Sequence, residues 1–224
     1  MTEYGANRFR TTLVAIAIIL AAFAAWILAP QFVERKTIEY PLAPELAASI
    51  SAQRNDFVLA ARIGGIRGDL WSEAAIAQDA IVSLSKSGTA TVGISQTREL
   101  AERAVRMAPH DSRTWVLLAA SDFRLGKLDE VASALRMSYY TGANIVELVP
   151  GRLALALQIQ AIQDSDFREL VRHDIEVAAV RKSELGSALL AEYKSAPPPG
   201  RELIEKTLAE LDPALLASIR AGLH

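Results

Sequence analysis

Few residues in the chain could support catalysis. Its 224 residues include no cysteine, which excludes a thiolate metal site, a cysteine nucleophile and a disulfide framework. Only three histidines occur, and two of them precede an aspartate, as His110-Asp111 and His173-Asp174. Such pairs can act as general acids and bases, so their setting in the chain decides how they are interpreted.

The settings of both pairs favour structural roles. His110 directly follows Pro109 in a predicted turn, where Asp111 or Ser112 is expected to cap the next helix. His173 and its neighbour lie inside a charged predicted helix. Adjacent residues of a helix do not share a face, so we expect both on a solvated surface.

No nucleotide-binding, zinc-protease or serine-hydrolase motif accompanies these residues. The carboxylates of Asp164 and Asp166 are better explained as caps at the start of a helix. We therefore expect no catalytic residue, no cofactor and no metal ion. The alternative is a helical enzyme, whose turnover would be sensitive to His110 or His173.

The charges of the chain argue against a nucleic-acid binder. Its 24 basic and 26 acidic residues give a net charge of −2, and no long basic run occurs. A nucleic-acid binder concentrates Lys and Arg to contact phosphates. The 51% of hydrophobic residues instead predicts a buried core, a membrane segment, or both.

An apolar segment near the N-terminus predicts a transmembrane helix over residues 11–30. Leu13 to Ala29 contains no polar side chain, and the segment spans about 30 Å at about 1.5 Å per residue. Trp26 stands near one end, as expected at a membrane interface. A signal peptide cleaved after Ala22-Phe23-Ala24 is the alternative. The apolar run continues past that point, which favours an uncleaved anchor.

The orientation of this helix follows from its place in the chain. Cations flank both ends, so the charge comparison is nearly balanced. A short tail before a single anchor usually stays in the cytoplasm. We expect residues 1–10 to be a cytoplasmic tail, the bilayer to hold residues 11–30, and the body to lie in the periplasm of a bacterium, anchored in the inner membrane.

The body is predicted to be all-α. Apolar residues recur at spacings of three and four in ten segments: 46–62, 70–84, 96–108, 112–124, 129–140, 151–162, 167–181, 184–195, 201–211 and 213–222. Prolines predict first helical turns at Pro44 and Pro213, with Asp212 as a cap, and Asp166 with Glu169 suggests a capping box. Turns are expected at Gly64-Gly65, Gly126 and Gly142, and a stiff spacer at residues 197–200.

A short signature repeats at the ends of three predicted helices. It consists of alanine, an apolar residue, arginine and another apolar residue, and its three copies begin at Ala60, Ala104 and Ala134. The first and second copies are followed by Trp71 and Trp115, which are 44 residues apart. The third copy begins 30 residues after the second, so the repeat has an irregular period.

The stretch from Glu99 to Glu130 resembles the tetratricopeptide repeat, a helical hairpin of 34 residues. Ala104 matches a small packing position, Pro109 the helix-ending proline, and Gly126 the turn between helices. An insertion over residues 85–94 would explain the longer period. Val131 and Asp122 depart from the family pattern. The resemblance covers residues 46–141 and implies stacked hairpins that bind proteins.

The resulting organisation has a juxtamembrane linker at residues 31–45, helical repeats at 46–141 and a helical C-terminal cap at 142–224. Trp71 and Trp115 are expected to fill gaps between layers. If the repeats bind a partner, one stripe of the better unit would line the concave side: Arg113, Val116, Ala120, Phe123 and Arg124. Its cations would suit an acidic segment. Ordinary surface charges beside a core Phe are the alternative.

Besides the helical enzyme, two functions remain open from the sequence. The first is a membrane-anchored adaptor or scaffold that holds membrane or envelope proteins in bacterial envelope assembly; similar anchored repeat proteins act in polysaccharide export or protein translocation. The second is an accessory subunit of a larger membrane complex. In that case the transmembrane helix is itself a contact, through small residues such as Ala15, Ala22 and Ala25.

Overall fold

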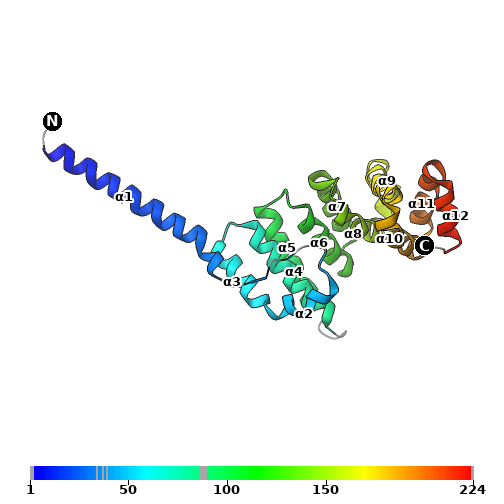
Figure 1. Cartoon of the computed structure of the whole chain (residues 1–224), viewed down its shortest axis with the longest axis horizontal. Coiled ribbons are helices and arrows are strands. Elements are labelled where there is room, and N and C mark those ends of the chain that lie inside the picture. Colours follow the sequence, from blue (N-terminus) through cyan, green and yellow to red (C-terminus); the bar gives the residue numbers. More distant parts are fainter. Residues whose placement is uncertain (1–2, 34, 37, 39, 86–89, 223–224) are drawn as a thin grey trace.

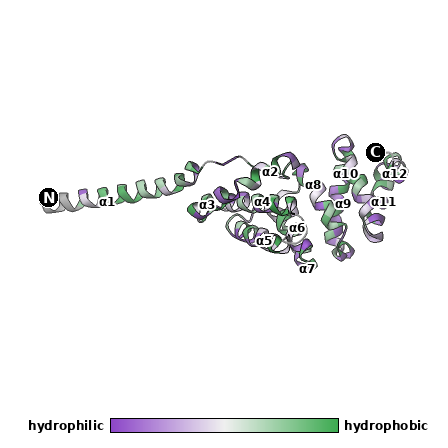
Figure 2. Cartoon of the chain, turned by 90° about the horizontal axis from the view of Figure 1, so that it is seen from below, coloured by the Kyte–Doolittle hydropathy of each residue, from purple (hydrophilic) through white to green (hydrophobic). Residues whose placement is uncertain are grey.

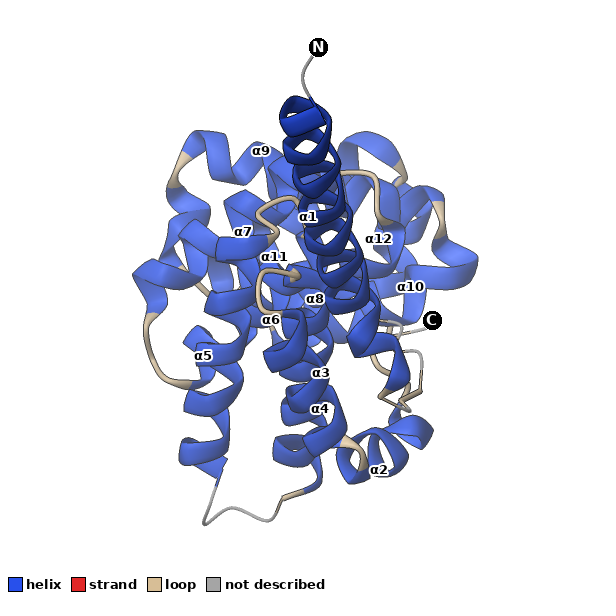
Figure 3. Cartoon of the chain, turned by 90° about the vertical axis from the view of Figure 1, so that its left-hand side faces the viewer, coloured by secondary structure: helices blue, strands red, loops and turns tan. Residues whose placement is uncertain are grey.

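A computed structural model describes residues 3–33, 35–36, 38, 40–85 and 90–222, and this part of the chain contains helices and connections but no strand (Figure 3). The α-helices are α1 (Glu3–Leu28), α2 (Pro44–Ala52), α3 (Arg54–Gly64), α4 (Gly68–Leu84), α5 (Ala90–Met107), α6 (Ser112–Arg124), α7 (Leu128–Gly142), α8 (Val149–Ala156), α9 (Ser165–Val180), α10 (Lys182–Ser195), α11 (Pro198–Leu211) and α12 (Pro213–Arg220). Three short 3-10 helices are η1 (Ala29–Phe32), η2 (Val146–Leu148) and η3 (Gln160–Gln163). The all-α prediction is confirmed.

Helix α1 stands apart from the body as a long, hydrophobic rod (Figures 1 and 2). Together with η1 it provides an apolar span, Phe9–Phe32, of 24 residues, long enough to cross a membrane. Its described side chains are exposed up to Leu28, as expected for a helix whose surroundings would be lipid. The C-terminal helices α11 and α12 lie at the opposite end of the molecule (Figure 1).

The first half of the body is a stack in which neighbours in sequence pack together. Helices α3, α4, α5, α6 and α7 each contact the next one, and α2 lies against α4. Buried alanines line these contacts, among them Ala61, Ala75, Ala101 and Ala119, each fully buried. Their small side chains let the helices approach closely.

The second half is a bundle around α9. This helix contacts α7, α8, α10 and α11, and its buried face carries Phe167, Val171, Ile175 and Ala178. Residues of both halves belong to one continuous apolar core. The expected boundary at residue 142 therefore coincides with the end of α7, while the core runs across it.

Several sequence predictions hold locally. Pro44 and Pro213 begin α2 and α12, and Asp212 caps α12 by accepting a hydrogen bond from the Leu215 amide at 2.9 Å. Asp111 caps α6, accepting from the Arg113 amide at 3.2 Å. Caps and prolines act within one helical turn, which is why the sequence predicts them.

Other predictions were wrong because they merged or misplaced helices. The segment 46–62 is two helices separated at Gln53, and the cap of α9 is Asp164, whereas Asp166 lies in the first turn. The proposed spacer at residues 197–200 is the start of α11, with Pro198 and Pro199 in its first turn. Proline is compatible with that position because the first amides of a helix have no partner within it.

The predicted insertion at residues 85–94 is also wrong in part. Residues 86–89 lie outside the described residues, but α5 already begins at Ala90. A Cβ on Gly93 would lie 2.8 Å from Val82 Cγ2, so this segment packs tightly on α4. The long spacing between the two tryptophans therefore reflects long helices more than an inserted loop.

Trp71 and Trp115 make the same kind of local hydrogen bond. The indole nitrogen of Trp71 donates to the Gly65 carbonyl at 2.8 Å, and that of Trp115 donates to the Pro109 carbonyl at 2.8 Å. Each bond reaches back six residues across the turn before the helix. Trp71 is buried, as expected, whereas Trp115 is only half-buried, so its predicted role as a core residue was wrong in part.

Candidate partner-binding groove

The predicted stripe on α6 does not form an open binding surface. Val116 is only 1% exposed, and Phe123 and Ala120 pack against the core. The expectation of a surface position for Val116 was therefore wrong. Arg113 and Arg124 are exposed, but each guanidinium contacts a carboxylate of the same chain.

The two arginines that were expected to bind an acidic segment already have carboxylate partners within the chain. The Arg124 Nη2 atom lies 2.6 Å from Asp79 of α4, and Arg113 Nε lies 3.0 Å from Asp111. Burial alone would raise the pKa of Asp111, but hydrogen bonds from Thr114 and Arg113 outweigh it, so the net pKa is lowered. Asp111 thus stays ionised and keeps its hold on Arg113.

The opposite face of α6 contributes to a groove between α5, α6 and α7. Its α6 residues are Trp115, Leu118 and Asp122, each two positions after a residue of the predicted stripe. Two positions correspond to about 200° around a helix of 3.6 residues per turn. The groove has a volume of about 500 Å³ and its full lining is Arg98, Glu102, Trp115, Leu118, Asp122, Asp129, Glu130, Ser133, Ala134 and Met137.

An ion pair forms the polar floor of this groove. Arg98 Nε donates to Asp122 Oδ1 at 2.5 Å, and Arg98 Nη1 lies 2.8 Å from Glu102 one turn away. The Asp122 side chain is only 2% exposed. Burial raises its pKa, and the hydrogen bond from Arg98 offsets part of that effect. Asp122 is also a position where the sequence departs from the repeat pattern that residues 46–141 resemble, and this ion pair gives a physical reason for an aspartate there.

The remaining charge of the groove is negative. Asp129 and Glu130 lie exposed in the first turn of α7, where carboxylates also favour the helix dipole. With Glu102 and Asp122 they make four carboxylates against the single guanidinium of Arg98. Beside them, the half-buried Trp115 and Met137 provide apolar surface. The groove can therefore accommodate a long side chain that has an aliphatic stem and a cationic end.

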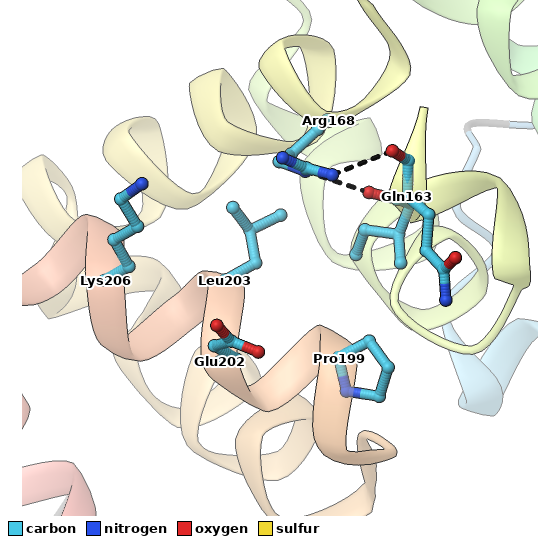
Figure 4. A pocket seen from close by; sticks show the side chains of 7 residues that line it. Gln163, Arg168, Pro199, Glu202, Leu203 and Lys206 are labelled. Atoms are coloured by element: carbon cyan, nitrogen blue, oxygen red, sulfur yellow. Dashed lines mark hydrogen bonds between the residues drawn. The ribbon is translucent and has the colours of Figure 1, made fainter. Parts of the chain in front are cut away.

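A pocket between η3, α9 and α11 has mixed polarity (Figure 4). Arg168 donates from Nε to the Ile162 carbonyl at 3.1 Å and from Nη2 to the Gln163 carbonyl at 2.8 Å. The guanidinium thereby completes the end of η3. Lys206 and Glu202 stand across the pocket on α11, with opposite charges that favour neither an anion nor a cation (Figure 4).

The two His-Asp pairs lie in separate parts of the molecule. His110 is exposed in the turn between α5 and α6, and His173 is exposed on α9 at the edge of a mostly apolar depression lined by Val177 and Val180. Among the residues described, no group of three or more His, Asp or Glu side chains is placed to hold a metal ion.

A buried ion pair at the joint of the two halves was missed by the sequence reasoning. Arg152 of α8 and Asp174 of α9 are both fully buried, with Nε and Oδ2 3.1 Å apart. The prediction that Asp174 is solvated was wrong. A signal existed, because Asp174 falls in register with the apolar positions Val171 and Ala178 of α9.

Arg152 also ties the end of α7 to this joint. Its Nη1 donates to the Gly142 carbonyl at 3.0 Å, and its Nη2 donates to the Ile145 carbonyl at 3.2 Å. Its guanidinium lies 4.7 Å from the centre of the Tyr139 ring. The residue thus joins α7, α8 and α9, which is a structural role.

No family model, curated protein or solved structure matches the chain.

Proposed function

We propose that the chain is a membrane-anchored adaptor that holds a protein partner at the bacterial inner membrane, with its body in the periplasm. The groove between α5, α6 and α7 carries the proposal, because it combines apolar surface with an excess of carboxylates. It would bind a basic segment of a partner protein. The resemblance of residues 46–141 to protein-binding repeats supports the same class of function, in envelope assembly such as polysaccharide export or protein translocation.

The charge of the groove decides the kind of segment that fits. An acidic segment would meet Asp129 and Glu130 at the rim and would be repelled. A lysine or arginine would place its stem along Trp115 and Met137 and its cation between the rim carboxylates. Contacts of this kind chiefly set specificity and the rate of association.

A matched pair of charge reversals tests the groove. Asp129→Lys with Glu130→Lys reverses the rim, and Asp166→Lys with Glu184→Lys makes the same change of charge in the first turns of α9 and α10. The full chain carrying each pair is isolated from its native membrane in mild detergent. A stoichiometric partner kept by the control and lost by the rim variant supports the proposal. Equal retention by both variants contradicts it.

Photo-cross-linking identifies the bound segment directly. A photoreactive amino acid replaces Ser133, which is exposed in the groove, or Ser183, which is exposed on α10. We expect Ser133 to give a cross-link to a segment rich in Lys or Arg, and Ser183 to give none. A cross-linked segment that is acidic or uncharged would rule out the proposed recognition.

The accessory-subunit alternative is tested by exchanging part of α1. Residues 9–25, which include Ala15, Ala22 and Ala25, are replaced by an unrelated apolar sequence, while residues 26–33, which include Trp26 and Pro30 at the contact with the body, are kept. Retained partner binding supports the adaptor, whereas loss supports a subunit held through its membrane helix.

The absence of cysteine makes the orientation easy to test. Ser133→Cys introduces the only thiol of the chain. A maleimide that cannot cross membranes should label it in intact spheroplasts if the body is periplasmic. Labelling only after lysis would place the body in the cytoplasm.

A further inference from the structure

The membrane helix is firmly attached to one turn of the body. The indole nitrogen of Trp26 in α1 donates to the Ile63 carbonyl at 2.8 Å. Pro30 of η1 is buried, and a Cβ on Gly64 would lie 3.4 Å from its Cγ atom. Residues 63–67, the end of α3 and the turn before α4, are called the α3–α4 turn, and they therefore have a defined position along α1.

Arg35 strengthens this attachment just beyond the membrane helix. Its Nη1 donates to the Pro30 carbonyl at 2.7 Å, and its Nε contacts Glu73 of α4 at 2.9 Å. The predicted juxtamembrane linker is therefore packed on the body near its start. Because Arg35 links η1 to α4, the turn keeps a fixed position along the axis of α1.

This position along α1 corresponds to the depth of the membrane interface. The apolar span Phe9–Phe32 has 24 residues. At about 1.5 Å per residue it is about 36 Å long, compared with about 30 Å for the hydrocarbon layer. Trp26 lies six residues before its end, or about 9 Å, and tryptophan prefers the interface. The turn that Trp26 contacts consequently lies at the edge of the hydrocarbon layer or slightly inside it.

The side chains near the turn fit such a position. Ile66 at its tip is 64% exposed, and Phe32 at the end of η1 is 87% exposed. A cavity of about 190 Å³ separates the turn from α1 and is lined by Phe23, Trp26, Ile27, Gly64, Ile66 and Arg67. This lining is almost wholly apolar. A lipid acyl chain would fill the cavity favourably, whereas water would not.

Three backbone carbonyls of the turn have hydrogen-bond donors within the protein, as a position without water requires. The Ile63 carbonyl accepts from Trp26, the Gly65 carbonyl accepts from Trp71, and the Gly64 carbonyl accepts from the Arg67 amide at 3.2 Å. An unsatisfied carbonyl is strongly disfavoured in lipid. Gly65 has φ of +56°, a conformation that favours glycine, and this lets the turn present both carbonyls to the two indoles.

We propose that the α3–α4 turn is a second membrane contact, with Ile66 and Phe32 inserted in the lipid interface beside α1. Arg62, exposed in the last turn of α3, would then lie near the lipid phosphates. The contact would fix the tilt of the body, so that the groove is held at a set distance from the bilayer. The inference depends on the membrane helix and is independent of any protein partner.

Fluorescence quenching by lipids tests this contact on the full chain. The only thiol is introduced as Ile66→Cys, Phe32→Cys or Val180→Cys and is labelled with an environment-sensitive dye. Val180 is a matched control, because it is an apolar residue with 76% exposure in α9, away from α1 (Figure 1). Each protein is placed in nanodiscs of phosphatidylcholine and phosphatidylglycerol that contain spin-labelled lipid.

We expect the dyes at positions 66 and 32 to emit at shorter wavelength and to be quenched several-fold more than the dye at 180. Quenching at 66 that equals the control would overturn the proposal, whatever position 32 shows. Circular dichroism establishes that each labelled chain keeps its helices. No partner protein is present, so failure here leaves the proposed adaptor function unaffected.

Discussion

The two halves of the body bury their helices by different means. Between residues 44 and 142, 13 of the 28 buried apolar residues described are alanines, whereas between 148 and 219 only 4 of 23 are. The first half therefore depends on close approach of small side chains. The second half depends on larger Leu, Ile and Val side chains around α9.

The halves also treat charge differently. In the stack, Asp122 pairs with Arg98 at the floor of a groove, and the Arg98 side chain is 21% exposed. At the joint with the bundle, Arg152 and Asp174 are both 0% exposed. An ion pair near solvent can remain accessible to a partner, whereas one fully removed from water cannot. The pair in the groove is therefore accessible from solvent, whereas the pair at the joint contacts only other parts of the chain.

The largest effect is expected at the joint. Arg152→Met leaves Asp174 buried without its counter-charge and removes donors to the Gly142 and Ile145 carbonyls. It should lower the free energy of unfolding by about 3 to 5 kcal/mol. Urea unfolding of the full chain in nanodiscs, followed by circular dichroism, measures this. Adding Asp174→Leu should recover part of the loss, and no recovery would mean that the carboxylate is not the cause.

The joint should also make stability depend on pH. Burial raises the pKa of Asp174 from 3.8 to about 7, and Arg152 offsets only part of this increase. The folded state therefore retains a proton that the unfolded state loses, so stability should fall as pH rises from 3.8 towards 7. The pKa rises by about 3, so the total loss should be about 4 kcal/mol.

Asp174→Asn provides the control for this pH dependence, because its side chain cannot ionise. The difference in unfolding free energy between the original chain and this variant should change with pH over that range. A constant difference from pH 4 to 7 would show that folding does not raise the pKa of Asp174.

A smaller effect should distinguish the close packing of the stack. A Cβ on Gly68 of α4 would lie 2.7 Å from the backbone nitrogen of Ala108, which cannot move aside without shifting the end of α5. Gly68→Ala should cost about 1 to 3 kcal/mol. Gly151→Ala in α8 is the matched change, because its Cβ would meet only Val116 Cγ1 at 3.4 Å. Equal thermal stability of the two variants would contradict the difference in packing.

The smallest expected effect concerns the groove. Trp115 is half-buried, so Trp115→Ala should cost about 1 to 2 kcal/mol of stability, less than the 3 to 5 kcal/mol typical of a fully buried tryptophan. Trp71→Ala, at a buried site, should show that larger loss. Thermal unfolding of both variants makes the comparison. A loss at Trp115 equal to that at Trp71 would mean that the groove is closed in solution.

The sequence predicted the helices better than their contacts. The apolar period located α6 to the residue and α4, α7, α9 and α10 within two residues at each end. It also joined α2 to α3, because the apolar pattern continues through Gln53 where the backbone turns. Local pattern specifies which residues can be helical, whereas a bend between helices depends on what each one packs against.

The residues proposed from the sequence for partner binding lie on the side of α6 that packs against the core, and the groove lies on the other side. Both faces of this helix contain apolar and charged residues, so composition alone did not distinguish them. Which face of α6 is covered depends on two other helices. Asp79 of α4 forms an ion pair with Arg124, and Gly151 of α8 lies close to Val116. Those helices are distant in the sequence, and their positions follow from the whole stack.

The sequence by itself determined the elements whose causes lie within a few residues. These are the apolar span of α1, the caps at Asp111 and Asp212, and the proline starts of α2 and α12. Only the tertiary structure decided which charges are buried and which surface is open. The pairing of Arg152 with Asp174 and the contact of Trp26 with Ile63 join distant segments, and burial depends on the neighbours that folding brings together.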